Sequence, residues 1–186
     1  MKTLIQSIRL TLVLTVLLCI IYPTIIAFAG KLSKGQGDGE KIIVNGKVVG
    51  YAAIGQKFNK PQYFWGRPSA VDYNAAGSAG SNKGPSNPDY LKDVNSRINT
   101  LLKYNPGLKR SDIPADLVTA SGSGLDPDIS PEAARIQVKR IAQYRKLDEQ
   151  KVAVLVKTHI QAPLLGMLGP ATVNVLKLNV ALDELR

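Results

Sequence analysis

Residues 10–30 read LTLVLTVLLCIIYPTIIAFAG and contain no charged side chain. A helix of about 20 residues reaches about 30 Å, which is the thickness of the hydrocarbon core of a bilayer. We therefore predict one transmembrane helix over residues 10–30, preceded by a short tail of residues 1–9. Pro23 has no amide proton to donate to the carbonyl of Cys19, so we expect a kink in the last third of this helix. Cys19 is the only cysteine, and no intrachain disulfide can form.

A cleavable signal peptide is the alternative interpretation of the same run. Lys2 and Arg9 precede it, and Ala27-Phe28-Ala29 has the small residues of a cleavage site. An uncleaved anchor is favoured because the apolar core of a signal peptide is usually only about 7–15 residues long. Lysines follow the run as well, so charge alone hardly decides orientation. Because a nine-residue tail is easily retained, we expect the N-terminus inside and the main domain outside.

The part of the chain beyond the anchor is long enough for one folded domain with its own core. Residues 31–40, KLSKGQGDGE, are polar and glycine-rich, as in a flexible connector. The 186-residue chain carries a formal net charge of +10, but its basic residues are scattered and no nucleic-acid-binding motif is present. The charge therefore indicates a solvated or lipid-facing surface and no nucleic-acid partner. We expect an extracytoplasmic domain over residues 41–186.

Residue patterns in this domain predict an α+β fold with a β-hairpin, about three helices and a C-terminal strand. Asn45-Gly46 between two apolar runs is typical of a two-residue hairpin turn. Apolar residues recur at helical spacing in 89–104, again after Ser130-Pro131, and again from about Asp148. In the second of these helices, Tyr144 is expected on the buried side together with Ala133, Ile136 and Ile141. Apolar and polar residues alternate in 173–180, which predicts a half-buried strand in one sheet with the hairpin.

No complete catalytic set is evident in the sequence. His159 is the only histidine and lies in a helical pattern, far from any nucleophile motif. Asp116, Asp126 and Asp128 could form a carboxylate pair or a calcium site, but they lack EF-hand spacing and equally fit turn chemistry. Ser121-Gly122-Ser123-Gly124 could cradle a phosphate through its backbone, although the lysine of a Walker motif is missing. An anchored envelope hydrolase using Ser121 or Ser123 is the alternative class of function.

Several long motifs occur in a fixed order along the domain. They are residues 63–69 (YFWGRPS), 80–88 (GSNKGPSNP), 116–131 (DLVTASGSGLDPDISP) and 173–179 (VNVLKLN). Together they closely resemble the C subunit of the bacterial potassium-transporting P-type ATPase, the Kdp complex. The resemblance extends from the anchor to the end of the domain.

This resemblance implies an accessory subunit of a high-affinity potassium uptake complex in the bacterial cytoplasmic (inner) membrane. Its partners would be a channel-like potassium-binding subunit, a P-type ATP-hydrolysing subunit and a small stabilising subunit. ATP, Mg²⁺ and potassium would be handled by the complex, and this chain would have no cofactor, metal or catalytic residue of its own. Its expected role is to assist assembly of the two large subunits.

The resemblance also implies candidate site residues. The family has been described as a catalytic chaperone that raises the ATP affinity of the hydrolysing subunit, which would assign nucleotide contact to Gln137 and to Ser121, Gly122, Ser123 and Gly124. An outward domain would not meet cytoplasmic ATP, so assembly is the preferred role. The resemblance further suggests an ordered docking loop over residues 77–88. Candidates for subunit contact are Phe64, Trp65, Arg67, Asn82, Ser86 and Asn87.

Overall fold

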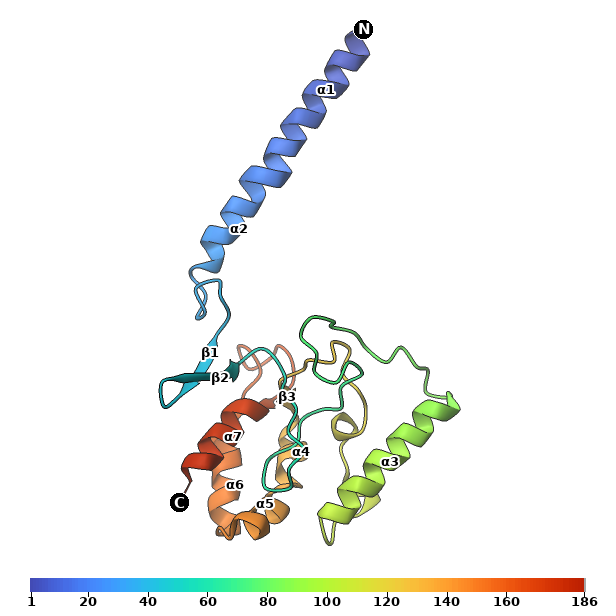
Figure 1. Ribbon diagram of the computed structural model, residues 1–186, viewed down its shortest axis with the longest axis vertical. Coiled ribbons are helices and arrows are strands. Elements are labelled where there is room, and N and C mark those ends of the chain that lie inside the picture. Colours follow the sequence, from blue (N-terminus) through green and yellow to red (C-terminus); the bar gives the residue numbers. More distant parts are fainter. Residues whose placement is uncertain (186) are drawn as a thin grey trace. The chain divides into compact units, whose positions relative to one another are not determined.

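The computed structural model describes residues 1–185 and divides into an N-terminal unit, residues 1–41, and a domain that starts at Ile42 (Figure 1). The N-terminal unit is helical from Lys2 to Gly30, comprising α1 (Lys2–Thr15), a π-helix (Val16–Ile21) and α2 (Tyr22–Gly30). Its 29 residues are long and apolar enough to cross a membrane. The predicted tail of residues 1–9 is therefore almost wholly part of the helix.

Pro23 is accommodated by the π-helix that precedes it. The i→i+5 bonds of a π-helix widen the turn, and a carbonyl that loses its α-helical donor can take another. Thr24 Oγ1 also donates to the Ile20 carbonyl at 2.6 Å. Where a kink was expected near Pro23, the structure has a π-helix followed by an α-helix.

The predicted hairpin is confirmed, as β1 (Lys41–Val44) and β2 (Lys47–Tyr51). Asn45 and Gly46 take φ values of 50° and 75°, which the turn between two twisted strands requires. The hairpin forms a two-stranded sheet of its own. The predicted sheet shared with the C-terminal strand is wrong.

A second sheet, of three short strands, organises the rest of the domain. Its order is β3 (Asp128–Ile129), β5 (Thr172–Asn174) and β4 (Ile160–Gln161), with both neighbours antiparallel to β5. Val173 is in register with Ile129 on one side and Ile160 on the other. The central strand therefore joins two distant parts of the chain.

Five α-helices surround this sheet and the loops beside it. They are α3 (Pro88–Tyr104), α4 (Pro131–Arg135), α5 (Val138–Arg145), α6 (Glu149–Thr158) and α7 (Val175–Glu184). Short 3₁₀ turns occur at Arg110–Asp112 and Ala115–Leu117. In Figure 1 α4 to α7 are grouped together and α3 is set apart from them. Predicted helix starts at Ser130 and Asp148 are confirmed, since both side chains cap the first turn of their helix.

The C-terminal segment corrects one prediction, because residues 175–180 are helical. Asn174 ends β5 and caps α7 by accepting a hydrogen bond from the Lys177 amide at 3.1 Å. Val175, Leu178 and Leu182 then share one buried face at helical spacing. The apparent alternation failed as a strand signal because the two adjacent apolar residues at 175 and 176 interrupt it.

The helix predicted after Ser130 is divided. Its first turn, α4, ends at Arg135, and α5 begins only after Gln137. Tyr144, predicted to lie on the buried side, is exposed. The division places the Gln137 side chain inside the core. Completely buried apolar side chains at the centre of that core are Phe64, Ala133, Ala134, Ile141, Val152, Val173, Leu178 and Leu182.

Candidate functional site

The aromatic segment around Phe64 crosses the core without a neighbouring strand, and side-chain amides bind its backbone instead. The Phe64 amide donates to Asn179 Oδ1 at 2.8 Å, and its carbonyl accepts from Asn179 Nδ2 at 3.0 Å. The Trp65 amide donates to Gln137 Oε1 at 2.8 Å, and its carbonyl accepts from Gln137 Nε2 at 3.1 Å. Because a carboxamide carries the same donor and acceptor as a peptide group, each side chain replaces one residue of a strand.

Two arginines of α5 extend this pairing toward the start of the segment. Arg140 Nη2 donates to the Tyr63 carbonyl at 2.7 Å and to Gln137 Oε1 at 2.7 Å. Arg145 Nε donates to the Gln62 carbonyl at 2.9 Å, and Arg145 Nη2 lies 2.5 Å from Asp183. We call the four side chains of Gln137, Arg140, Arg145 and Asn179 the polar cradle.

The indole of Trp65 is fixed on several sides. The Arg140 guanidinium stacks on it at 3.9 Å from the ring centroid, and Tyr104 meets it edge-on at 5.4 Å. The indole Nε1 donates to the Lys60 carbonyl at 2.9 Å. Packing thus connects α3, through Tyr104, to the polar cradle on α5 and α7.

Arg140 is a buried cation, with 1% of its surface exposed. Burial lowers its pKa to about 10, so it remains protonated at neutral pH. Its Nε and Nη1 and the Oδ1 of Asn105 are buried without a hydrogen-bond partner. Arg140 and Asn105 both line a cleft of about 280 Å³, which is large enough for ordered water.

The residues predicted to contact nucleotide are engaged within the domain. Gln137 is fully buried, and its Nε2 also donates to the Ala133 carbonyl at 3.0 Å. Ser121 Oγ accepts from the Gly124 amide at 2.9 Å, and Ser123 Oγ accepts from the Leu125 amide at 3.0 Å. No hydrogen bond within residues 1–185 joins Gln137 to the loop of residues 121–124. Nucleotide binding at these residues stays a prediction.

Gly124 shows how closely the loop 121–124 is packed. It takes a φ of +69°, and a Cβ there would lie 2.6 Å from Val71 Cγ2 and 2.8 Å from the Ala79 carbonyl oxygen. Ser78 Oγ donates to the Ser123 carbonyl at 3.0 Å. The start of the predicted docking loop is therefore ordered against residues 121–124.

The six candidates for subunit contact divide into two groups. Phe64 is buried in the core, Trp65 is half-buried, and Arg67 Nη1 pairs with Asp126 at 2.9 Å. The other three lie in the loop before α3. Asn82 and Ser86 are exposed, and Asn87 caps α3 by accepting from the Tyr90 amide at 3.1 Å.

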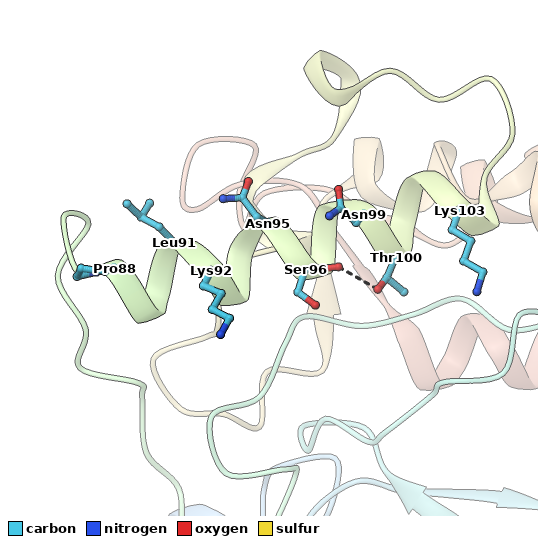
Figure 2. A pocket seen from close by; sticks show the side chains of 8 residues that line it. All are labelled: Pro88, Leu91, Lys92, Asn95, Ser96, Asn99, Thr100 and Lys103. Atoms are coloured by element: carbon cyan, nitrogen blue, oxygen red, sulfur yellow. Dashed lines mark hydrogen bonds between the residues drawn. The ribbon is translucent and has the colours of Figure 1, made fainter.

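An open hollow of about 800 Å³ extends along α3 from the end of this loop. Figure 2 shows that one helix supplies all its lining side chains, most of them polar. These are Pro88, Leu91, Lys92, Asn95, Ser96, Asn99, Thr100 and Lys103. Leu91, one of the apolar residues at helical spacing in 89–104, is exposed. The hollow was not foreseen, since its residues give only an ordinary polar helix face in sequence.

The remaining chemical candidates also have structural contacts. Asp116 Oδ2 accepts from the Ser130 amide at 2.7 Å, and Asp128 Oδ1 accepts from Asn174 Nδ2 at 3.1 Å. His159 Nδ1 lies 2.8 Å from the Leu155 carbonyl oxygen, and no hydrogen bond in the described residues joins His159 to Ser121. Residues 1–185 contain no group of three or more potential metal ligands.

The N-terminal helix, the fold and the site define a class of protein, which is a small α+β domain with one helix able to span a membrane. The family model of the K⁺-transporting ATPase, c chain, matches residues 4–184. The chain is 63% identical over 186 residues to the potassium-transporting ATPase KdpC subunit of Flavobacterium johnsoniae, covering 100% of both. It is 51% identical over 189 residues to that of Bacteroides fragilis, covering 100% and 99%. The chain belongs to the KdpC family, and the resemblance found in its motifs is confirmed.

A third relative gives the same result. The KdpC subunit of Caldanaerobacter subterraneus is 51% identical over 180 residues, covering 96% of this chain and 93% of the relative. The chain is thus a subunit of a potassium-transporting ATPase, which implies partner subunits.

Proposed function

We propose that this chain assists assembly of a high-affinity potassium uptake complex. Family membership over the whole chain supports it. The observation that carries the assembly role is the exposed polar surface formed by the end of the 77–88 loop and the hollow along α3. The polar cradle holds the interior, whereas this surface faces solvent and is available to another protein.

The partners proposed are those implied by the family. They are a channel-like potassium-binding subunit, a P-type ATP-hydrolysing subunit and a small stabilising subunit, which handle potassium, ATP and Mg²⁺. The chain would span the cytoplasmic membrane once, with its N-terminus inside and its domain on the outer side. In this arrangement the two lysines in the hollow, Lys92 and Lys103, suit an acidic partner surface.

A catalytic chaperone role is the finer part of this proposal. The contacts of Gln137 favour an indirect effect on ATP affinity, because nucleotide contact would first break its bonds to the Trp65 backbone. We propose that any such effect passes through contacts between subunits. Gln137 would then be a positioning residue for the aromatic segment.

The assembly proposal is tested by removing two exposed side chains without straining the backbone. Asn82 takes a φ of +52°, so glycine is the replacement that this conformation tolerates. Asn82→Gly with Ser86→Ala should lower the yield of the larger subunits that co-purify with the chain by several-fold. It should leave the thermal unfolding of the domain nearly unchanged, since both side chains are exposed.

Asn45→Gly is the matched control, because Asn45 is exposed in another turn with a φ of +50°. It should leave the yield unaltered. Equal yields for both variants would contradict docking at the 77–88 loop. A fully assembled complex with weakened potassium affinity would instead assign this loop to the ion path.

A further inference from the structure

The turn between β4 and β5 is the most apolar exposed segment of the domain. Residues 162–171 read APLLGMLGPA and contain no charged or hydrogen-bonding side chain. Four large apolar side chains extend from it, namely Leu164, Leu165, Met167 and Leu168, with 68%, 78%, 81% and 58% of their surface exposed. Contiguous exposure of this kind marks a contact with a membrane or another protein.

The backbone of this turn is closed on itself. Leu164 and Leu168 exchange both amide-to-carbonyl hydrogen bonds, at 3.0 and 2.9 Å. Gly166 and Met167 donate to the carbonyls of Pro163 and Leu164 at 2.9 and 3.2 Å. The turn therefore needs few hydrogen bonds from its surroundings, although its side chains are in water.

These properties suit hydrocarbon better than a protein partner. Protein interfaces surround their apolar centre with polar side chains and favour aromatic residues, methionine and arginine. Of these, residues 162–171 offer only Met167, whose thioether is a weak acceptor, so they can give a protein no strong directional side-chain contact. The hydrocarbon of a bilayer offers no hydrogen-bond partners. A segment whose backbone amides and carbonyls are largely hydrogen-bonded to one another can therefore enter the boundary of the bilayer.

The short connector and the charge of the residues around the turn also favour the bilayer as its contact. The connector of residues 31–40 spans at most about 35 Å when fully extended, which keeps the domain near the bilayer. Residues 151–182 contain lysines and one histidine but no aspartate or glutamate, so these flanks do not repel anionic headgroups. We propose that residues 164–168 insert into the headgroup–acyl boundary of the bilayer that holds the anchor. The domain would then be attached at two points.

The test places a fluorophore at the turn in the full chain within the reconstituted complex. Cys19→Ser removes the native thiol, and Met167→Cys is labelled with an environment-sensitive probe. The vesicles contain phosphatidylcholine and phosphatidylglycerol, with or without spin-labelled lipid. Spin-labelled lipid should quench the probe at position 167 several-fold more strongly than a probe at Lys109→Cys, an exposed control site.

A second variant tests the cause. Leu165 takes a φ of +56° and is exposed, so Leu165→Asn fits the backbone and should not disturb folding. It should reduce quenching at position 167 several-fold while thermal unfolding is unchanged. Unaltered quenching would overturn the proposal. So would a probe at 167 that is water-exposed, or one shielded from water yet not quenched by lipid, because a partner protein would then cover the turn.

Discussion

Asp128 and Asn174 show how single polar residues join separate elements of this domain. Asn174 Nδ2 donates to the Ala52 carbonyl at 2.8 Å and to Asp128 Oδ1, while its Oδ1 caps α7. The hairpin, the three-stranded sheet and α7 therefore meet at one carboxamide. Neither residue could be assigned this role from sequence, because Asn174 lies 122 residues from Ala52 and 46 from Asp128.

The carboxyl of Asp128 gives a prediction about pH. Burial raises its pKa above the ordinary value and the neighbouring Asp126 adds to this, although the bond from Asn174 opposes it. A raised pKa means that the folded state binds the proton more tightly, so ionisation of Asp128 reduces stability as the pH rises through that pKa. Asp128→Asn keeps the acceptor for Asn174 and removes the charge. It should be more stable than the parent chain at pH 7.

The gain should shrink as the pH falls through the raised pKa of Asp128 and disappear below the ordinary carboxyl pKa, where the parent side chain is neutral in both the folded and the unfolded state. Chemical denaturation of both chains between pH 3.5 and 7 measures this, and other carboxyls cancel in the difference. Asp89→Asn, on the exposed first turn of α3, is the control and should show no such gain. A variant less stable than the parent at pH 7 would contradict the sign.

At the scale of elements, the sequence predicted local features well and long-range ones poorly. The hairpin turn, the helix starts at Ser130 and Asp148 and most of α3 depend on neighbouring residues, and all were predicted. The helix α7 was mistaken for a strand although the adjacent apolar residues Val175 and Leu176 interrupt the alternation, and its contact with the aromatic segment through Asn179 could not be read from the sequence. The polar cradle could not be predicted at all, since Gln137 and Asn179 bind backbone 72 and 115 residues away.

Gln137 connects two elements, and its replacement tests the polar cradle. Gln137→Met keeps a similar volume but leaves the part-buried amide and carbonyl of Trp65 without partners. Each unsatisfied group costs about 1–3 kcal/mol, so the free energy of unfolding should fall by about 2–6 kcal/mol. Denaturation of the full chain in detergent measures it.

Gln143→Met is the matched control, because Gln143 is exposed on the same helix, α5, and should change stability very little. The potassium-dependent ATPase activity of complexes made with either variant gives the second readout. Normal stability of the Gln137 variant with a raised KM for ATP would favour direct nucleotide contact over the positioning role.

For the whole molecule, the division into one helix long and apolar enough to span a membrane and one domain was predictable, because a long charge-free run and the composition after it are properties of the sequence alone. The helix begins at Lys2, eight residues earlier than the apolar run suggested. Lys2 and Arg9 are compatible with this, since long basic side chains at a helix end can extend toward the headgroups. The surface that contacts a partner was only partly predictable. Phe64 and Trp65 are aromatic residues of the kind found in interfaces, but Phe64 lies in the core and Trp65 packs beside it.

Retention of the anchor is the last prediction. Signal cleavage needs an accessible, extended segment around small residues, whereas Ala27, Ala29 and Gly30 all lie within α2. Intact-mass measurement of protein extracted from membranes should give the full chain of 20.1 kDa, apart from processing of Met1. Replacing Ala27 and Ala29 with leucine blocks cleavage at this position, and should alter the mass only by the substitutions themselves. A chain beginning at Gly30, restored to full length by the leucine variant, would show that residues 1–29 are a signal peptide.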